Sequence, residues 1–245
     1  MNRFANKTVL VTGGTSGIGL ATAQAYAAEG ARVVVTGRDE AALAAARDLL
    51  GAHALAYRND AASPAASREL AAALREEGVQ LDAVFINAGV AKFAPFDQVD
   101  EALWDDSFNI NVKGAYFQIQ ALLPLLNSGA SIVLNGSINA HIGMPSSSVY
   151  AASKAALVSF AKTLSAELLP RGVRVNVVSP GPVTTPLHGK LGMDDATKGE
   201  LAKQIPLGRF GTAAELASTV LHLSAPESAF IVGTEIIVDG GMSQL

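Results

Sequence analysis

The chain has 245 residues, about half of them hydrophobic, and is long enough for one α/β domain with a large core. Its net charge of −4 excludes the basic surface of a nucleic-acid-binding protein, and no cluster of lysine and arginine indicates a membrane surface. The absence of cysteine excludes disulfides, thiolate catalysis and cysteine-ligated metals, and the four histidines are too scattered for a helical metal pair. We therefore expect a cytoplasmic protein without a metal site, since the N-terminus also lacks the apolar region of a signal peptide.

Short apolar runs alternate with longer segments rich in alanine and leucine. In chain order, this pattern predicts strands at residues 8–12, 32–36, 52–57, 82–86, 131–135, 174–178 and 235–238. It predicts helices at 18–29, 40–50, 64–77, 149–169 and 213–223, and a long, interrupted helical stretch at 100–126. Several strands are apolar at consecutive positions, as in a parallel sheet that helices cover on both faces.

The fold class predicted from this alternation is α/β, a single-domain Rossmann-type doubly wound parallel sheet of about seven strands with helices on both faces. No linker divides the chain, so we assign residues 1–245 to one Rossmann-type domain. The least regular segment, residues 184–206, follows the carboxyl end of a strand. Because ligands bind at that edge of an open α/β sheet, we expect this segment to be a substrate lid.

A glycine-rich segment follows the first predicted strand, where residues 12–19 read TGGTSGIG. Glycines permit a tight turn and bring backbone N–H groups and a helix N-terminus against a pyrophosphate. The spacing differs from the common GxGxxG, and an ordinary glycine-rich turn is the alternative interpretation. The residues expected to contact the cofactor here are Gly13, Thr15, Ser16, Gly17, Ile18 and Gly19.

The end of the second predicted strand indicates which dinucleotide would bind. A carboxylate at this place would bind the adenosine ribose and repel a 2′-phosphate, but the chain has Gly37 followed by Arg38. A guanidinium can bind a phosphate through two parallel hydrogen bonds and can stack on adenine. Asp39 is the competing ribose-binding residue, although it suits the N-cap of the next helix. We therefore predict NADP(H) rather than NAD(H).

Tyr150 and Lys154 are four residues apart in a predicted helix and so lie on one face of it. A free tyrosine, with a pKa of about 10, is a poor base, but a neighbouring ammonium would lower that pKa and permit proton exchange with a substrate oxygen. Ser137 follows an apolar strand at its carboxyl end, where its hydroxyl could donate to the same oxygen. Taken alone, the Tyr–Lys pair could equally be an amphipathic surface pair.

Together these motifs resemble those of the short-chain dehydrogenase/reductase family. The resemblance covers nearly the whole chain in order: TGGTSGIG at 12–19, NAG at 87–89, NVKG at 111–114, Ser137, YAASK at 150–154 and SPGPV at 179–183. It implies that Tyr150 is the general acid in reduction and the base in oxidation, and that Lys154 also holds the nicotinamide ribose. It further implies that Ser137 polarises the substrate carbonyl and that Asn111 takes part in a water-linked proton relay. The remaining implied cofactor contacts are Gly37, Asp60, Ala61, Asn87, Ala88, Gly89, Pro180, Gly181, Val183 and Thr185.

The substrate is the least determined feature of the sequence. The predicted pocket wall is mostly apolar and consists of Ile138, Asn139, His141, Pro182 and Leu187. This wall favours a small-molecule ketone or secondary alcohol with apolar substituents. A 3-oxoacyl-thioester (acyl-carrier-protein) reductase, a sugar or polyol dehydrogenase and a non-catalytic NADP(H)-sensing protein remain alternatives. The resemblance also implies a homotetramer that pairs the long helices near residues 100–126 and 149–169 and packs the C-terminal strand.

Overall fold

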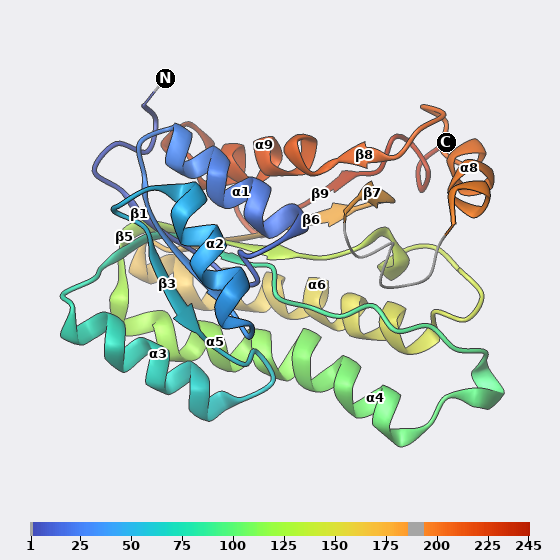
Figure 1. The fold of residues 1–245 in the computed structure, drawn as a ribbon, viewed down its shortest axis with the longest axis horizontal. Helices are drawn as coiled ribbons and strands as arrows, with labels where there is room; N and C mark the ends of the chain where they lie inside the picture. Colours follow the sequence, from blue (N-terminus) through green and yellow to red (C-terminus); the bar gives the residue numbers. More distant parts are fainter. Residues whose placement is uncertain (1, 186–193) are drawn as a thin grey trace.

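A parallel sheet of seven strands runs through the centre of the computed structural model, which describes residues 2–185 and 194–245 (Figure 1). The strand order is β3-β2-β1-β4-β5-β6-β9, so the chain first runs outward from β1 to β3 and then crosses over and runs outward from β4 to β9. The predicted Rossmann-type doubly wound fold is thereby confirmed. The strands are β1 (Thr8–Val11), β2 (Arg32–Gly37), β3 (Leu55–Arg58), β4 (Leu81–Ile86), β5 (Leu126–Asn135), β6 (Arg174–Pro180) and β9 (Glu235–Val238).

Helices cover both faces of this sheet (Figure 1). One face carries α1 (Gly17–Ala28), α2 (Glu40–Leu50) and α9 (Ala213–Ser224), and the other carries α3 (Pro64–Glu76), α4 (Glu101–Phe108), α5 (Ala115–Leu122) and α6 (Ser148–Leu168). In β2, Val33 and Val35 pack into the core under α1 and α9, whereas Val34 packs into the core on the opposite face. This two-sided burial is the reason for the consecutive apolar residues in the central strands.

Two strands begin at places that the sequence pattern did not predict. The third strand begins at Leu55 and not at residue 52, because Gly51 takes a φ of +92° and accepts a hydrogen bond from the Ala54 N–H in a turn. The fifth strand begins at Leu126 and not at residue 131, and its pairing with β4 is irregular between Leu81 and Ala83. The predictions failed here because turn geometry and pairing irregularities depend on neighbouring segments.

The predicted helical stretch at residues 100–126 is divided into several pieces. A π-helical turn (Asn109–Gly114) separates α4 from α5, and a 3₁₀ turn (Leu123–Leu125) leads directly into β5. At Gly114 an added Cβ would lie 1.9 Å from the carbonyl oxygen of Ala61, so a tertiary contact accompanies the widened turn. Such π-turns occur often at functional sites.

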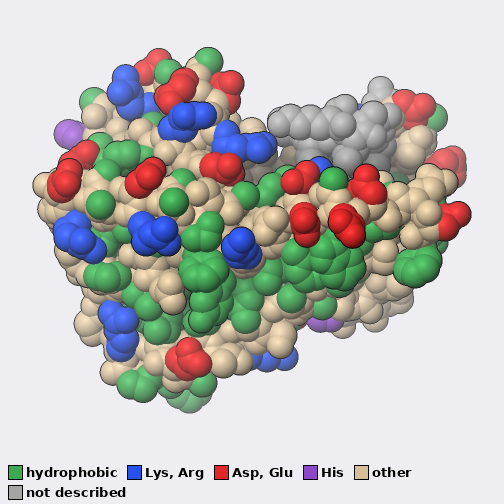
Figure 2. Space-filling view, turned by 90° about the horizontal axis from the view of Figure 1, so that it is seen from below, with side chains coloured by type: hydrophobic (Ala, Val, Ile, Leu, Met, Phe, Trp, Pro, Cys, Tyr) green, Lys and Arg blue, Asp and Glu red, His purple; other side chains and the backbone are tan. Residues whose placement is uncertain are grey.

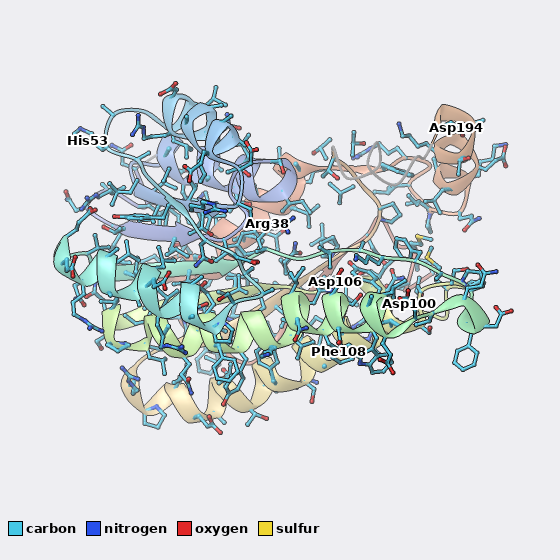
Figure 3. The ribbon with its side chains drawn as sticks, turned by 60° about the horizontal axis from the view of Figure 1, so that its bottom comes forward. Arg38, His53, Asp100, Asp106, Phe108 and Asp194 are labelled. Carbon is cyan, nitrogen blue, oxygen red and sulfur yellow. The ribbon has the colours of Figure 1, made fainter. Side chains whose placement is uncertain are left out.

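The segment predicted to be a lid contains elements that the sequence did not reveal. These are β7 (Val183–Thr184), which pairs with β8 (Gly211–Thr212), and α8 (Asp195–Lys203). Asp194 caps α8 by accepting a hydrogen bond from the Thr197 N–H at 2.8 Å, and Figure 3 places it far from Arg38. Residues 186–193, including the predicted pocket residue Leu187, lie outside the described residues. Among the described helices, none has the length and apolar character needed to cross a membrane.

Candidate active site

The turn between β1 and α1 is shaped by glycine. Gly13 and Gly17 have φ angles of +63° and +53°, which residues with a side chain rarely adopt. An added Cβ at Gly19 would lie 2.2 Å from the Gly13 carbonyl oxygen, so only glycine lets α1 approach the turn this closely. Ser16, the N-cap residue, makes no side-chain cap hydrogen bond. The first N–H groups of α1 and the positive end of its dipole are therefore available to a phosphate.

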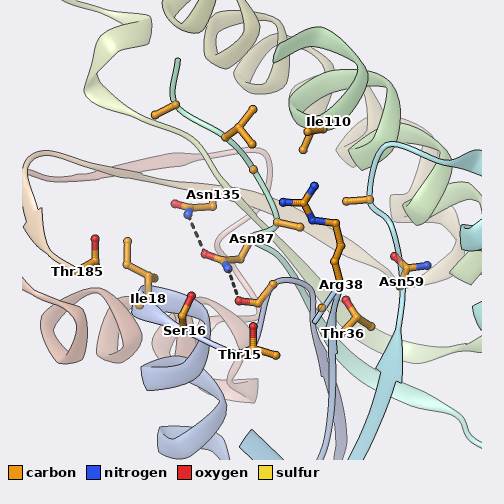
Figure 4. Close-up of a pocket in the computed structure, with 18 of the residues that line it drawn as sticks. Thr15, Ser16, Ile18, Thr36, Arg38, Asn59, Asn87, Ile110, Asn135 and Thr185 are labelled. Carbon is orange, nitrogen blue, oxygen red and sulfur yellow. Dashed lines mark hydrogen bonds between the residues drawn. The ribbon is translucent and has the colours of Figure 1, made fainter. Parts of the chain in front are cut away.

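A cavity of about 310 Å³ opens beside this turn at the carboxyl edge of the sheet (Figure 4). Its wall includes most of the predicted cofactor residues: Gly13, Thr15, Ser16, Gly17, Ile18, Gly37, Arg38, Asp60, Ala61, Asn87, Ala88, Gly89, Tyr150, Lys154 and Thr185. The wall does not include Gly19, Pro180, Gly181 or Val183. It does include residues that the motifs did not suggest, namely Thr36, Asn59, Val90, Ala91, Ile110 and Asn135.

One end of the cavity, here called the adenosine end, lies at the carboxyl ends of β2 and β3. An added Cβ at Gly37 would lie 2.8 Å from Cγ2 of Thr15, so a side chain at this position would require Thr15 to shift. Asp39 caps α2 by accepting a hydrogen bond from the Ala42 N–H at 2.7 Å, as its N-cap interpretation requires. Arg38 extends across the cavity towards Ile110 (Figure 4). Position 37 therefore places no negative charge beside the guanidinium of Arg38.

Tyr150 and Lys154 lie at the other end of the cavity, here called the reactive end. Both lie in the first turns of α6 and line the cavity wall, and the Lys154 Nζ lies 5.7 Å from the centre of the Tyr150 ring. The Lys154 Nζ donates a hydrogen bond to the backbone carbonyl oxygen of Asn135 at 2.7 Å. Ser137 follows β5 and is buried, and its hydroxyl accepts a hydrogen bond from the Asn139 N–H at 3.2 Å. The fold thus brings the predicted Ser–Tyr–Lys set together from two elements.

Burial dominates the ionisation of this set. It raises the pKa of Tyr150, and a hydrogen bond with Ser137 acts in the opposite direction. Burial also lowers the pKa of Lys154 to about 8, because the ammonium loses its hydration. Burial is therefore the largest influence on the Tyr150 pKa, and it favours the protonated phenol. A protonated phenol is the form that a general acid requires.

Asn111 lies in the π-helical turn and is fully buried. Its Oδ1 accepts a hydrogen bond from the Val90 N–H at 2.8 Å, and its Nδ2 donates to the Val90 carbonyl oxygen and to Oγ of Ser153 at 2.9 and 3.0 Å. Both polar atoms of the side-chain amide are hydrogen-bonded, and these bonds join the segment after β4 to α6. Asn111 therefore supports the helix that carries Tyr150 and Lys154.

Asn87 joins the phosphate-binding turn to the centre of the sheet. Its Nδ2 donates to the carbonyl oxygens of Thr12 and Gly13 at 3.0 and 3.2 Å, and the N–H groups of Asn87 and Ala88 donate to the Thr12 hydroxyl at 2.8 and 2.9 Å. Asn135 donates in turn to Oδ1 of Asn87 at 3.0 Å. The sequence reasoning missed Asn135, although a polar residue that ends an apolar strand directly before the Gly136–Ser137 pair was a signal for it.

The described residues of the predicted substrate wall lie outside the wall of the cavity. Ile138 is buried, and Asn139 bonds to the Ser137 hydroxyl through its N–H. His141 points to another partner: its Nε2 lies 2.7 Å from Oε1 of Glu235 in β9. The Pro182 carbonyl accepts a hydrogen bond from Gly211 and so joins the β7–β8 pair. None of these four residues belongs to the wall of the described cavity.

The groups that line the cavity suit a dinucleotide. The described residues contain no cluster of three histidine or acidic side chains. The turn that closes on Gly19 leaves α1 N–H groups for a pyrophosphate, and Oδ1 of Asn135 is a buried acceptor without a hydrogen-bond partner. Arg38 follows β2 and Lys154 bonds to the end of β5, so the two cations line the cavity from strands that β1 and β4 separate. The cavity can therefore receive an elongated anionic ligand whose far end reaches Tyr150.

Comparisons with known proteins agree along the whole chain. A family model described as enoyl-(acyl carrier protein) reductase matches residues 13–243. The oxidoreductase asL5 of Sarocladium schorii is 35% identical over 100% of this chain and 99% of its own length. The 3-oxoacyl-[acyl-carrier-protein] reductase FabG of Escherichia coli is 34% identical over 98% of both proteins.

The fold is also shared with solved structures. The Pseudomonas aeruginosa RhlG/NADP active-site complex superposes with a TM-score of 0.93 at 32% sequence identity, covering 99% of this chain and 98% of that one. The sequence motifs, the doubly wound sheet and the full-length matches lead to one assignment. The chain belongs to the short-chain dehydrogenase/reductase family and is an oxidoreductase of that family.

Proposed function

We propose that this protein transfers a hydride between NADP(H) and a small-molecule ketone or secondary alcohol with apolar substituents, with Tyr150 as the general acid and base. The observation that carries the proposal is that Tyr150 and Lys154, beside the end of β5, line the same cavity as Arg38, which follows β2. A dinucleotide of this kind has its phosphate at one end and its reactive ring at the other, which matches the polarity of the cavity.

In the proposed reduction, the Tyr150 hydroxyl gives its proton to the substrate oxygen. Burial keeps this phenol protonated, and Ser137, which bonds to it, is placed to donate a hydrogen bond to the same substrate oxygen. When bound, the nicotinamide supplies the hydride at its C4 carbon. Lys154 contributes a buried positive charge beside the tyrosine, and Asn111 fixes α6 through Ser153. In oxidation Tyr150 accepts the proton.

The preference for NADP(H) rests on steric and electrostatic features of the adenosine end. Gly37 supplies no carboxylate to bind the ribose of NAD(H), and Asp39 is engaged at the N-cap of α2. Arg38 lines this end of the cavity and can bind the 2′-phosphate, and no acidic side chain at position 37 opposes it. The NADP present in the P. aeruginosa complex supports this assignment.

The substrate proposal rests on the scarcity of fixed charge beyond Tyr150. The side chains between Ser137 and Tyr150 include no lysine or arginine, and the edge of the Tyr150 ring packs on Phe93 with 5.5 Å between ring centres. This environment suits an apolar substituent better than a carboxylate or a phosphate. Likeness to FabG makes a 3-oxoacyl thioester the second candidate. The segment at residues 184–206 is proposed to close over either substrate as a lid.

We also propose that the protein is a homotetramer that uses the exposed face of α4 and α5. Hydrophobic side chains gather on this face (Figure 2). Trp104, which stacks on Phe108 with 4.8 Å between ring centres, is 48% exposed, and Tyr116 is 42% exposed. Figure 3 shows Phe108 on the opposite side of α4 from Asp106. Exposed aromatic groups of this size usually mark a contact surface. Sedimentation at micromolar concentration would contradict the proposal if it found a monomer.

The deciding experiment measures the loss of NADPH absorbance with aryl-alkyl ketones, diketones, sugars and an acetoacetyl thioester, with NADH in parallel. We expect ketone turnover with NADPH, and we expect Tyr150→Phe to lower kcat/KM by roughly 10²- to 10⁴-fold while the variant still binds NADPH. Faster turnover of the thioester than of any ketone would favour the second candidate. Binding of NADPH without turnover of any substrate would favour a sensing protein.

A further inference from the structure

The orientation of the Asn135 side chain is fixed by its neighbours. Asn87 Nδ2 donates to two carbonyl oxygens, those of Thr12 and Gly13, so the amide of Asn87 can have only one orientation. Its Oδ1 must then receive a donor, and the Nδ2 of Asn135 supplies it at 3.0 Å. Asn135 is therefore forced to turn its own Oδ1 away from Asn87.

This oxygen has no hydrogen-bond partner in the described part of the chain, and it is shielded from solvent. Figure 4 shows it pointing towards the side of the pocket where Ile18 and Thr185 lie, away from Arg38. A buried acceptor without a donor costs about 1–3 kcal/mol of folding free energy. Asn135 itself lines the cavity wall at the reactive end, so the unpaired oxygen lies beside the place of the nicotinamide.

The charges at this end make such an oxygen useful. The backbone oxygen of Asn135 already accepts a hydrogen bond from the buried ammonium of Lys154 at 2.7 Å. Oxidised nicotinamide would bring a second positive charge close to that ammonium, and in a site of low dielectric the two would repel each other. A carbonyl dipole with its negative end at this wall offsets that repulsion for the oxidised ring and offers nothing comparable to the neutral reduced ring.

We propose that Asn135 is a nicotinamide-binding residue whose side-chain oxygen favours the oxidised, positively charged form of the cofactor over the reduced form. The proposal rests on the proposed NADP(H)-dependent function and adds a specificity-determining residue to it. Asn135 would then contact the nicotinamide ring, and its hydrogen bonds would link that ring to the phosphate-binding turn through Asn87 and to Lys154.

The experiment compares dissociation constants of NADP⁺ and NADPH by titration calorimetry in the wild type and in Asn135→Leu. Leucine has the same branching as asparagine and lacks both polar atoms. We expect the dissociation constant of NADP⁺ to rise about fivefold relative to that of NADPH, as is typical for one lost interaction with a charged group. Asn135→Ala, which leaves space instead of adding methyl groups, should shift the ratio in the same direction if the leucine variant does not fold.

Two controls separate this effect from structural damage. Adenosine 2′,5′-bisphosphate lacks the nicotinamide, so its affinity should be the same in Asn135→Leu and in the wild type. Asn127→Leu makes the same change at the opposite end of β5, where the side chain bonds to Asp82, and it should leave the ratio of the two dissociation constants unchanged. Equal losses for NADP⁺ and NADPH in the Asn135 variants, or a similar loss for the bisphosphate, would overturn the proposal.

The outcome also distinguishes this inference from the proposed function. If the wild type binds neither NADP(H) nor NAD(H), the proposed function fails and the inference fails with it. If the wild type binds NAD(H) instead, the same ratio is measured with that pair, and a shift supports the inference. If the wild type binds the dinucleotide and the ratio does not move in either Asn135 variant, only the inference is wrong.

Discussion

The turn proposed to bind phosphate, between β1 and α1, and the reactive end of the cavity are built by different physical means. At the turn, Gly19 lets backbone atoms approach within a distance that any side chain would block, and Gly13 takes a positive φ. At the reactive end, the side chains of Tyr150 and Lys154 are removed from water. Burial raises the pKa of Tyr150 and lowers that of Lys154, so it favours the neutral form of each. Shape therefore governs the first region and electrostatics the second, and substitutions in the two regions should fail in different ways.

The largest expected effect is steric and belongs to the turn. Gly19→Ala would place a Cβ 2.2 Å from a backbone oxygen, so either α1 or the turn must move, and we expect a loss of about 3 kcal/mol in unfolding free energy together with weaker NADPH binding. Gly199→Ala in α8 is the matched control, because nothing lies within 4 Å of its added Cβ. Denaturant unfolding should show the control equal to or slightly more stable than the wild type. An unchanged Gly19→Ala protein would show that the turn yields easily.

The next effect tests the electrostatic region through pH. Burial lowers the pKa of Lys154 to about 8, whereas the unfolded chain keeps the usual value of 10.5. Between these values the unfolded protein binds more protons than the folded one, so wild-type stability rises as the pH is raised. Between pH 7 and pH 9.5, the unfolding free energy of the wild type should rise by about 2 kcal/mol relative to that of Lys154→Met. Lys154→Met itself should be the more stable protein at pH 7.

Thermal and denaturant unfolding of both proteins at the two pH values measure this gain. Lys162→Met provides the control on the same helix, since Lys162 is exposed and its replacement should produce no pH-dependent gap. If the unfolding free energies of the wild type and of Lys154→Met change with pH in parallel, burial in the cavity wall does not lower the pKa of Lys154.

The contrast between the two regions also explains what the sequence could predict. Strands such as β1 and β2 were predicted within one residue because their apolar runs are buried on both faces. The turn between β1 and α1 was predicted because glycine is the residue that readily adopts the positive φ angles of such a turn. The effect of burial on the Tyr150 pKa was not predicted, since motif spacing placed a lysine nearby but did not reveal how deeply the phenol is buried. Tertiary burial, and not spacing, sets that value.

Other misses have the same origin. The π-helical turn at Asn109–Gly114 accompanies the contact of Gly114 with Ala61, two segments far apart in the sequence. His141 was predicted to line the substrate pocket, but it pairs with Glu235 in the last strand. Asn135 was passed over because its role depends on the orientation of Asn87. Each of these depends on a partner that local pattern cannot identify.

A smaller effect is expected at the adenosine end, where shape and charge meet. Arg38→Ala should raise the dissociation constant of NADPH about tenfold, because one charge-assisted contact with the 2′-phosphate is lost. NADH, which lacks that phosphate, serves as the internal control and should bind the variant and the wild type alike. Titration calorimetry with both cofactors gives the ratio. Equal effects on NADPH and NADH would mean that Arg38 only stacks on the adenine.

The smallest effect separates the two candidates for ribose recognition in that same region. Asp39 accepts the N-cap hydrogen bond from Ala42 at 2.7 Å, so Asp39→Ala should lower the unfolding free energy by about 1 kcal/mol. It should leave the preference for NADPH over NADH unchanged, because the carboxylate acts on α2 and not on the ribose. Asp39→Ser, which retains a capping oxygen, should recover most of the stability. An Asp39→Ala protein that lost affinity for NADH while keeping its stability would assign the ribose to this carboxylate, and the adenosine end would then be governed by charge as fully as the reactive end.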